Sequence, residues 1–291
     1  MNSLEPGLIT SLACGLLTAT GFGTADFVAK LSTGRVGFLR TALLMQTIGG
    51  MLLLPFALPD ASLLFLQPWA TVGGLMLGVI NAIATIALYK GFEVGRLTIV
   101  SPIASCAPLV SVILAVVLLG ESITLERAVG ISFVVIGIIL VSIQSAHEGL
   151  SEKLGQGVVY AFLFMILGGT LLVGLKPVSH VLGVYLPVFL MRWMGVPVIG
   201  VTFLMWRPKG TIRLNSLSFI VVVAILDTFA NVIYTYGVSV GTVAIVSTLG
   251  GLFSAVTVLL AWALLKERMT RHQLLGFVAI AAGITILGLV G

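Results

Sequence analysis

The sequence consists almost entirely of long apolar runs separated by short polar or Pro/Gly-rich breaks. Runs such as Ile131–Ile143 and Phe219–Leu226 do not alternate apolar and polar residues, so they do not fit the strands of a membrane barrel. Because backbone polar groups in hydrocarbon must be paired within the chain, the runs predict membrane-spanning helices. We expect ten of them, over 7–30, 36–57, 67–90, 96–119, 126–144, 155–176, 181–206, 215–237, 241–265 and 271–290.

Composition supports membrane helices and narrows the set of partners. The chain has 291 residues, of which 59% are hydrophobic and 9% are charged, whereas roughly a quarter of the residues of a soluble domain are charged. The formal net charge of +5 is scattered, without a stripe of Lys and Arg interleaved with aromatic residues. Nucleic acid is therefore not expected as a partner. The expected location is the cell membrane, where the lipid bilayer surrounds a multi-pass protein.

The second half of the chain repeats the first after a shift of 146 residues, which carries Glu121 onto Glu267. Only the second span slips, because Arg40 matches Arg192 at a shift of 152 residues. Chance similarity between apolar runs would not align glycine and polar positions so consistently. The 146-residue shift also aligns Lys30 with Lys176, Gly91 with Gly237, Gly95 with Gly241, Ile99-Val100-Ser101 with Ile245-Val246-Ser247, Thr124 with Thr270, Gly130 with Gly276 and Gly137 with Gly283.

Each repeat contains five predicted spans, and an odd number of spans reverses the orientation of the second copy in the membrane. We therefore predict an all-α integral membrane protein with ten transmembrane helices arranged as two inverted five-helix repeats. The first repeat covers residues 1–147 and the second covers residues 148–291, and the two form one membrane unit. In such folds the substrate site lies near the middle of the bilayer between the repeats.

Two copies of a short motif carry a resemblance to a known family. They are Leu118-Leu119-Gly120-Glu121 with Thr124 and Gly130, and Leu264-Leu265-Lys266-Glu267 with Thr270 and Gly276. Together with Arg40, Arg192 and Ser101-Pro102 followed by Pro108, the motif resembles the drug/metabolite transporter superfamily, specifically its EamA-type ten-helix members and their YddG-like amino-acid exporters. The resemblance covers essentially the whole chain. It implies a transporter that exports amino acids or related metabolites.

Asp227 is the clearest ionisable residue within a predicted span, and such residues are expensive in hydrocarbon unless they have a partner or a function. Its repeat mate is Asn81, and one helical turn later Asn231 matches Thr85, so each pair lies on one helix face. One interpretation is that Asp227 faces a central cavity and binds a proton or a cationic substrate. The other is that Asp227 forms a buried salt bridge with Arg192.

Other polar residues have two interpretations each. Asp26 either serves the substrate site or pairs with Lys30 one turn later. Small residues of the fourth and ninth spans favour close helix packing, and tyrosines near span ends are often interface anchors. The candidates for substrate binding or coupling are Asp227, Asn231, Asn81, Thr85, Tyr234, Ser105, Thr248 and Asp26, and the candidates for structural ion pairs are Arg192 and Arg40.

Two acidic residues at span ends are assigned structural roles. Glu121 and Glu267 each lie before a predicted helix, where a carboxylate favourably caps the helix N-terminus. Alternatively, Glu121 pairs with Arg127 and Glu267 pairs with Arg271.

The sequence lacks the usual signatures of an enzyme. The three histidines fall between spans, no His/Cys/Asp cluster has metal-ligand spacing, and no serine has a histidine in a span to activate it. We therefore expect no metal, no cofactor and no catalytic residues. A channel is the main alternative, but it would need a polar pore or filter.

The expected function is a secondary transporter that moves a small-molecule substrate by alternating access. Proton coupling is an open option, as is the choice between monomer and homodimer. Orientation is open too, because two indications disagree. Basic residues gather in the connections after odd-numbered spans, which places both termini outside the cytoplasm. The family resemblance implies both termini inside.

Overall fold

The computed structural model describes residues 6–94, 100, 103–142, 152–206, 214–265 and 271–289. The regular elements in these ranges are helices. In chain order they are α1 (Pro6–Val36), α2 (Phe38–Ala57), α3 (Leu63–Leu66), α4 (Pro68–Val94), α6 (Ala107–Leu119), α7 (Leu125–Ser142), α8 (Glu152–Leu182), α9 (Tyr185–Trp206), α10 (Leu214–Val240), α11 (Val243–Gly250), α12 (Phe253–Leu265) and α13 (Arg271–Leu289).

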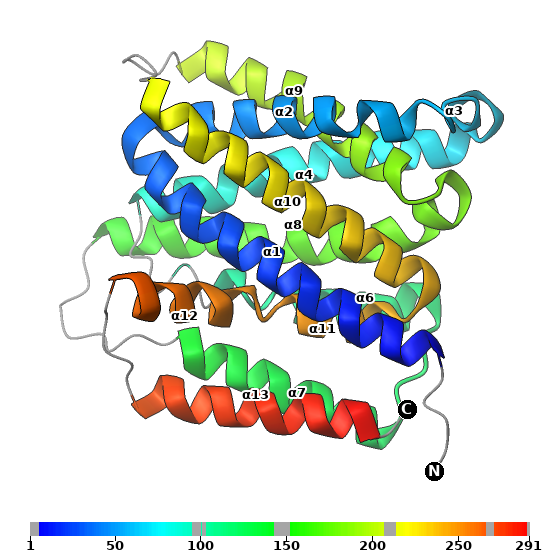
Figure 1. Ribbon diagram of the computed structural model, residues 1–291, viewed down its shortest axis with the longest axis vertical. Coiled ribbons are helices and arrows are strands. Elements are labelled where there is room, and N and C mark those ends of the chain that lie inside the picture. The colour runs from blue at the N-terminus through cyan, green and yellow to red at the C-terminus, as the bar shows by residue number, and fades with distance from the viewer. Residues whose placement is uncertain are drawn as a thin grey trace.

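The predicted all-α membrane architecture is confirmed. Helices α1, α2, α4, α8, α9 and α10 are each long and apolar enough to cross a bilayer, and the other predicted spans correspond to shorter apolar helices. The start of α1 and the end of α13 lie at the same end of the helices (Figure 1), as an even number of crossings requires. The short helix α3 between α2 and α4 was not predicted.

The fourth and ninth predicted spans, over 96–119 and 241–265, are each interrupted by a turn. Ser105 and Cys106 form a turn immediately before α6, and Gly251 and Leu252 form a turn between α11 and α12. The two turns occupy equivalent positions under the 146-residue shift. Broken helices near the middle of a membrane protein are tolerated where the freed backbone groups line a cavity or are buried in protein.

There is a steric reason for glycine at position 251, in the turn between α11 and α12. A β-carbon at this position would lie 2.5 Å from Cγ of Pro108 and 3.2 Å from Cδ1 of Ile138, so only glycine permits the approach of the proline ring. The backbone remains paired, since the Gly251 amide donates to the Ser247 carbonyl at 2.9 Å. The small size of this residue therefore permits the close contact of the turn with α6 and α7.

Helix packing follows the internal repeat. Helix α1 packs along α10, and its repeat mate α8 packs along α4, the mate of α10. In the same way α12 contacts α1 and α6 contacts α8, while α2 packs on α9 and α7 packs on α13. Figure 1 shows the last two pairs at opposite edges of the bundle. These paired contacts are what a pseudo-two-fold axis between the halves produces.

The seam between α7 and α13 uses repeat-related glycines. A β-carbon on Gly137 would lie 2.7 Å from the carbonyl oxygen of Gly276, and a β-carbon on Gly283 would lie 2.7 Å from the carbonyl oxygen of Gly130. The two contacts exchange under the 146-residue shift. Small residues at such crossings let helix backbones approach closely, which is a common basis of helix association in membranes.

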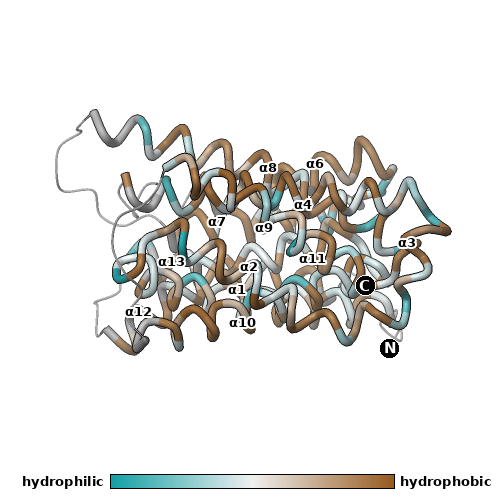
Figure 2. Tube along the Cα trace, turned by 90° about the horizontal axis from the view of Figure 1, so that it is seen from above, coloured by the Kyte–Doolittle hydropathy of each residue, from teal (hydrophilic) through white to brown (hydrophobic). Residues whose placement is uncertain are grey.

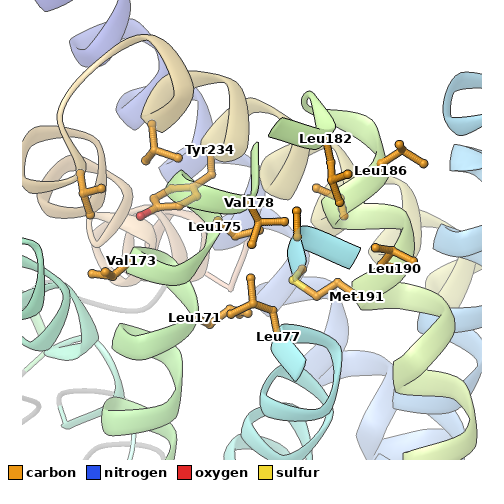
Figure 3. Packing of buried hydrophobic residues seen from close by; sticks show 14 of the residues in the cluster. Leu77, Leu171, Val173, Leu175, Val178, Leu182, Leu186, Leu190, Met191 and Tyr234 are labelled. Atoms are coloured by element: carbon orange, nitrogen blue, oxygen red, sulfur yellow. The ribbon is translucent and has the colours of Figure 1, made fainter. Parts of the chain in front are cut away.

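The distribution of polarity is that of a membrane protein. Large apolar side chains such as Val117 and Met205 are exposed, whereas Thr18, Gln46 and Arg192 are buried, and brown, hydrophobic residues dominate the outer helices (Figure 2). A buried apolar cluster fills the space between α4, α8, α9 and α10. Its labelled members Leu77, Leu175 and Met191 converge there, and Tyr234 lies at its edge (Figure 3).

Candidate functional site

A central cavity lies between the two halves. Its volume is about 120 Å³, which suits a small molecule. Helices from both repeats form the wall. Its lining residues include Thr18, Phe22 and Asp26 of α1; Met45 of α2; Asn81, Thr85, Leu88 and Tyr89 of α4; Pro108 of α6; Phe164, Gly168, Leu171 and Leu172 of α8; Arg192 of α9; Asp227, Asn231 and Tyr234 of α10; Ser247 and Gly250 of α11; Gly251; and Phe253 of α12.

The lining is built largely from repeat mates. Under the 146-residue shift the mates of six of the eight lining residues of α1 and α4 also line the cavity. The cavity therefore lies where the pseudo-two-fold axis passes between the halves. The mates differ chemically, so the wall is not symmetric. Thr18 corresponds to Phe164, Phe22 to Gly168, Asp26 to Leu172, Asn81 to Asp227, Thr85 to Asn231 and Leu88 to Tyr234.

Arg192 and Asp227 form a salt bridge at the cavity wall. The guanidinium donates from Nη2 to Oδ2 of Asp227 and from Nη1 to Oε1 of Gln46 at 2.8 Å. Asn231 adds donors from Nδ2 to the Asp227 carbonyl at 2.8 Å and to its Oδ2 at 3.2 Å. The Arg192 side chain is 1% exposed, and a charge buried to this degree requires such partners.

The space for this network comes from glycines on neighbouring helices. A β-carbon on Gly195 would lie 2.8 Å from Nε2 of Gln46, and one on Gly49 would lie 3.2 Å from Nε of Arg192. Glycine therefore lets the guanidinium and the amide pass between α2 and α9. Asp227 therefore forms the predicted ion pair with Arg192, and both residues line the cavity. The ion pair and a role of Asp227 in the cavity are compatible.

Asp26 also lines the cavity. Among the residues that the structure describes, none lies within hydrogen-bonding or ion-pairing distance of its carboxylate. Asp227 is a second carboxylate in the same wall. The predicted partner Lys30 has a side chain outside the described part of the chain, so that expected pair stays a prediction.

Two further lining residues carry polar atoms without a described partner. Oγ1 of Thr18 and Nδ2 of Asn81 are buried and make no hydrogen bond within the described residues. Unpaired buried polar atoms cost free energy unless a ligand or water satisfies them. Their position at the wall of a cavity indicates that a bound molecule or water supplies the missing partner.

Tyr234 contributes its ring to the cavity but its hydroxyl to the scaffold. The hydroxyl donates to the Leu172 carbonyl at 2.9 Å and shares a hydrogen bond with Oγ of Ser247 at 2.7 Å. It therefore ties α10 to α8 and α11. A ligand would contact the ring of this predicted site residue, because its polar atom is already engaged.

Most of the predicted binding residues converge on the cavity. Asp227, Asn231, Asn81, Thr85, Tyr234 and Asp26 line it, whereas Ser105 and Thr248 do not belong to the lining. Ser105 lies in the turn before α6, and Thr248 is buried with its hydroxyl bonded to the Ala244 carbonyl at 2.6 Å. Arg40, predicted to form a structural ion pair, donates from Nη1 to the Val36 carbonyl at 3.4 Å.

Sequence reasoning missed the phenylalanines of the wall. Phe22, Phe164 and Phe253 line the cavity together with Met45. Apolar side chains carry no signal in a chain where most residues are apolar, so nothing in their type separates them from lipid-facing phenylalanines. A usable signal was helical spacing together with the repeat, because Phe22 lies one turn before Asp26 on α1 and Phe164 lies two turns before Leu172, the repeat mate of Asp26, on α8.

Glu121 makes a polar bridge between the halves, so the prediction that it pairs with Arg127 or caps the following helix was wrong. Its Oε1 lies 2.7 Å from Nζ of Lys176, and its two carboxylate oxygens accept from the amides of Val243 at 2.9 Å and Ala244 at 3.1 Å. It therefore caps α11, a helix of the other repeat. The equivalent residue Glu267 lies outside the described residues.

Lys176 completes this bridge. Besides Glu121, Nζ of Lys176 donates to the carbonyl of Gly241 at 3.0 Å. The lysine is one helical turn beyond the cavity-lining residues of α8, so the bridge lies at one end of the cavity. We refer to Glu121, Lys176 and the first turn of α11 as the Glu121 bridge.

A bundle of inverted helical repeats with broken helices and a polar cavity between the halves is typical of membrane proteins that move solutes. Comparison with known proteins makes the class specific. The chain belongs to the EamA-like transporter family, whose model matches residues 9–143 and again residues 155–289. The protein is thus an integral membrane transporter of small solutes.

Two further comparisons found similar proteins. An uncharacterized protein of Methanocaldococcus jannaschii is 28% identical over 136 residues, which are 47% of this chain and 98% of that protein. A solved crystal structure is similar with a TM-score of 0.81 at 16% identity and covers 97% of each chain. At this identity the structural match shows the fold alone.

Proposed function

We propose that the protein is a secondary transporter that moves a small organic solute by alternating access between its two halves. The observation that carries the proposal is the cavity between the repeats, whose wall combines ionisable residues from α1, α9 and α10 with apolar ones from both halves. A site at the repeat interface can face either side of the membrane when the halves rock against each other.

The Glu121 bridge supports alternating access because it joins elements that must separate when the cavity opens at that end. Glu121 belongs to the first repeat, whereas Lys176 and α11 belong to the second. Its charged groups are held by four polar contacts. When the cavity opens, water can replace polar contacts of this kind at a modest cost in free energy. The Glu121 bridge is therefore suited to form and break in each transport cycle.

The apolar wall of the cavity favours a small metabolite with a hydrophobic portion as substrate. The family resemblance favours export, with amino acids and related metabolites among the expected solutes. Asp227 is the candidate for proton coupling. Protonation of its carboxylate would break the salt bridge to Arg192 and leave that buried cation without its ionic partner.

The test is solute flux in proteoliposomes that contain the purified protein. A panel of L-amino acids and their amine and amide derivatives is offered with and without a pH gradient, and the accumulated solute is measured by mass spectrometry. A transporter gives saturable, solute-specific flux, whereas flux that grows linearly with concentration at channel-like rates would support the alternative of a channel. Asp227→Asn with unchanged rate, affinity and pH dependence would exclude both coupling and substrate binding by Asp227.

A further inference from the structure

We propose that the cavity selects a monovalent organic cation, such as a primary amine with an apolar body, and that Asp26 is the residue that determines this specificity. The proposal rests on the proposed function, because it names the substrate class of the same cavity. Its basis is the distribution of charge and of unpaired polar atoms in the wall.

The charges of the cavity wall do not balance. Asp26, Arg192 and Asp227 are the charged residues of the described lining, and the salt bridge between Arg192 and Asp227 neutralises two of them. Asp26 remains without a described partner. With all three groups ionised the wall carries one net negative charge, which a ligand with one positive charge compensates in a low-dielectric environment.

A ligand carboxylate finds no equivalent cation. Nη1 and Nη2 of Arg192 already donate to Gln46 and Asp227, and its third nitrogen, Nε, is buried and faces the position of Gly49 on α2. Binding a zwitterion such as an amino acid would place its carboxylate near Asp227 without a free cation to receive it. The wall therefore favours an amine over the amino acid of the same shape.

The surroundings of Asp26 suit the rest of such a ligand. The Thr18 hydroxyl, two turns earlier on α1, and Nδ2 of Asn81 are unpaired, so they can bond a neutral polar group. Phe22 and Phe164 contribute apolar walls, and aromatic faces attract organic cations as well as apolar groups. The repeat mate of Asp26 is Leu172, which also lines the cavity, so the second half does not supply a matching carboxylate at this level.

The experiment uses three probes that share a phenyl ring and a short carbon chain but differ in charge. They are 2-phenylethylamine, L-phenylalanine and 3-phenylpropanoate, which are respectively a cation, a zwitterion and an anion near neutral pH. Each is titrated against the purified full-length protein in detergent, and the apparent affinity is read from the rise in melting temperature. We expect 2-phenylethylamine to bind at least about tenfold more tightly than L-phenylalanine, and 3-phenylpropanoate to give no shift.

Three substitutions assign the preference to Asp26. Asp26→Asn removes the charge with little change of shape and should weaken the binding of 2-phenylethylamine at least about tenfold. Asp26→Glu keeps the charge and should retain most of the affinity. Asp60→Asn is the matched control, since it removes the same charge from an exposed residue outside the cavity, and it should bind all three probes like the unaltered protein.

The outcomes separate this inference from the proposed function. Tighter binding of L-phenylalanine or 3-phenylpropanoate than of the amine, no binding of any probe, or an Asp26→Asn variant with unchanged amine affinity would each overturn the inference. The probe series on the unaltered protein tests the charge preference even if Asp26→Asn does not fold. Transport itself is judged by the proteoliposome panel, so saturable flux of other solutes would leave the proposed function standing while the cation preference falls.

Discussion

Replacing Glu121 by Gln should open the cavity at the end where the Glu121 bridge lies. The change removes the negative charge that pairs with Lys176 and caps α11. A side chain that caps a helix N-terminus contributes about 0.5–2 kcal/mol. The ion pair adds a further contribution between that of an exposed pair, about 0–1 kcal/mol, and that of breaking a buried pair, about 3–5 kcal/mol.

The exposure of the pair sets where in this range it falls. The Glu121 side chain is 8% exposed and that of Lys176 is 20% exposed, so we assign the pair about 1–3 kcal/mol. Allowing for the hydrogen bonds that Gln retains, the substitution should destabilise the form that is closed at this end by about 2–4 kcal/mol in total. Since 1.4 kcal/mol is a factor of ten, the population ratio of open to closed forms at this end should rise roughly 30- to 700-fold.

Thiol labelling measures that population. In a background with Cys14→Ala and Cys106→Ala, a single Thr85→Cys substitution places a thiol at the cavity wall. A membrane-impermeant maleimide is then added to either side of oriented vesicles. Glu121→Gln should accelerate labelling from the side of the bridge and slow it from the opposite side, because the two openings exclude each other in alternating access.

The control is Glu126→Gln, which removes the same charge from an exposed residue at the start of α7. It should leave labelling from both sides unchanged. Equal labelling rates for Glu121→Gln and the unaltered protein would refute the assignment of the bridge as the closing contact. Faster labelling from both sides at once would also refute it, since that result indicates a loosened fold instead of a shifted equilibrium.

Three other predictions test the site and the helix packing. Asp227→Asn leaves the buried Arg192 without its ionic partner, so it should destabilise the protein by about 3–5 kcal/mol, measured as a fall in melting temperature that a second substitution, Arg192→Gln, partly reverses. Gly137→Ala places a β-carbon 2.7 Å from a backbone oxygen of α13 and should destabilise the protein by about 1–3 kcal/mol. The control Gly34→Ala, with no atom within 4 Å of the new carbon, should be neutral or stabilise α1 by up to about 1 kcal/mol. Similar melting temperatures for the two variants would contradict the close α7–α13 seam. Tyr234→Phe removes two hydrogen bonds that join α10 to α8 and α11 and should lower the free energy of unfolding by about 1–3 kcal/mol. The affinity for 2-phenylethylamine should change less than in Asp26→Asn. A larger loss of affinity than in Asp26→Asn would show that the hydroxyl contacts the ligand.

The sequence by itself determined the class of protein, the helical spans and the repeat. Hydrocarbon allows only helices or closed barrels to span it, so an apolar chain without strand alternation has few solutions. The 146-residue shift then identified equivalent positions, and most of the polar candidates found along it line one cavity. Polar residues in hydrocarbon are few and expensive, which is why they could be selected without any coordinates.

The tertiary structure decided which of these residues meet and which remain free. Pairing of Arg192 with Asp227 and Gln46, and of Glu121 with Lys176 and α11, joins residues 35 to 146 positions apart, which local pattern cannot specify. The close contact of Gly251 with Pro108 also joins residues far apart in the sequence. Asp26 has no partner among the described residues, and this could be seen only once the groups around it were placed, because the electrostatics of a cavity depend on the whole set of groups that face it.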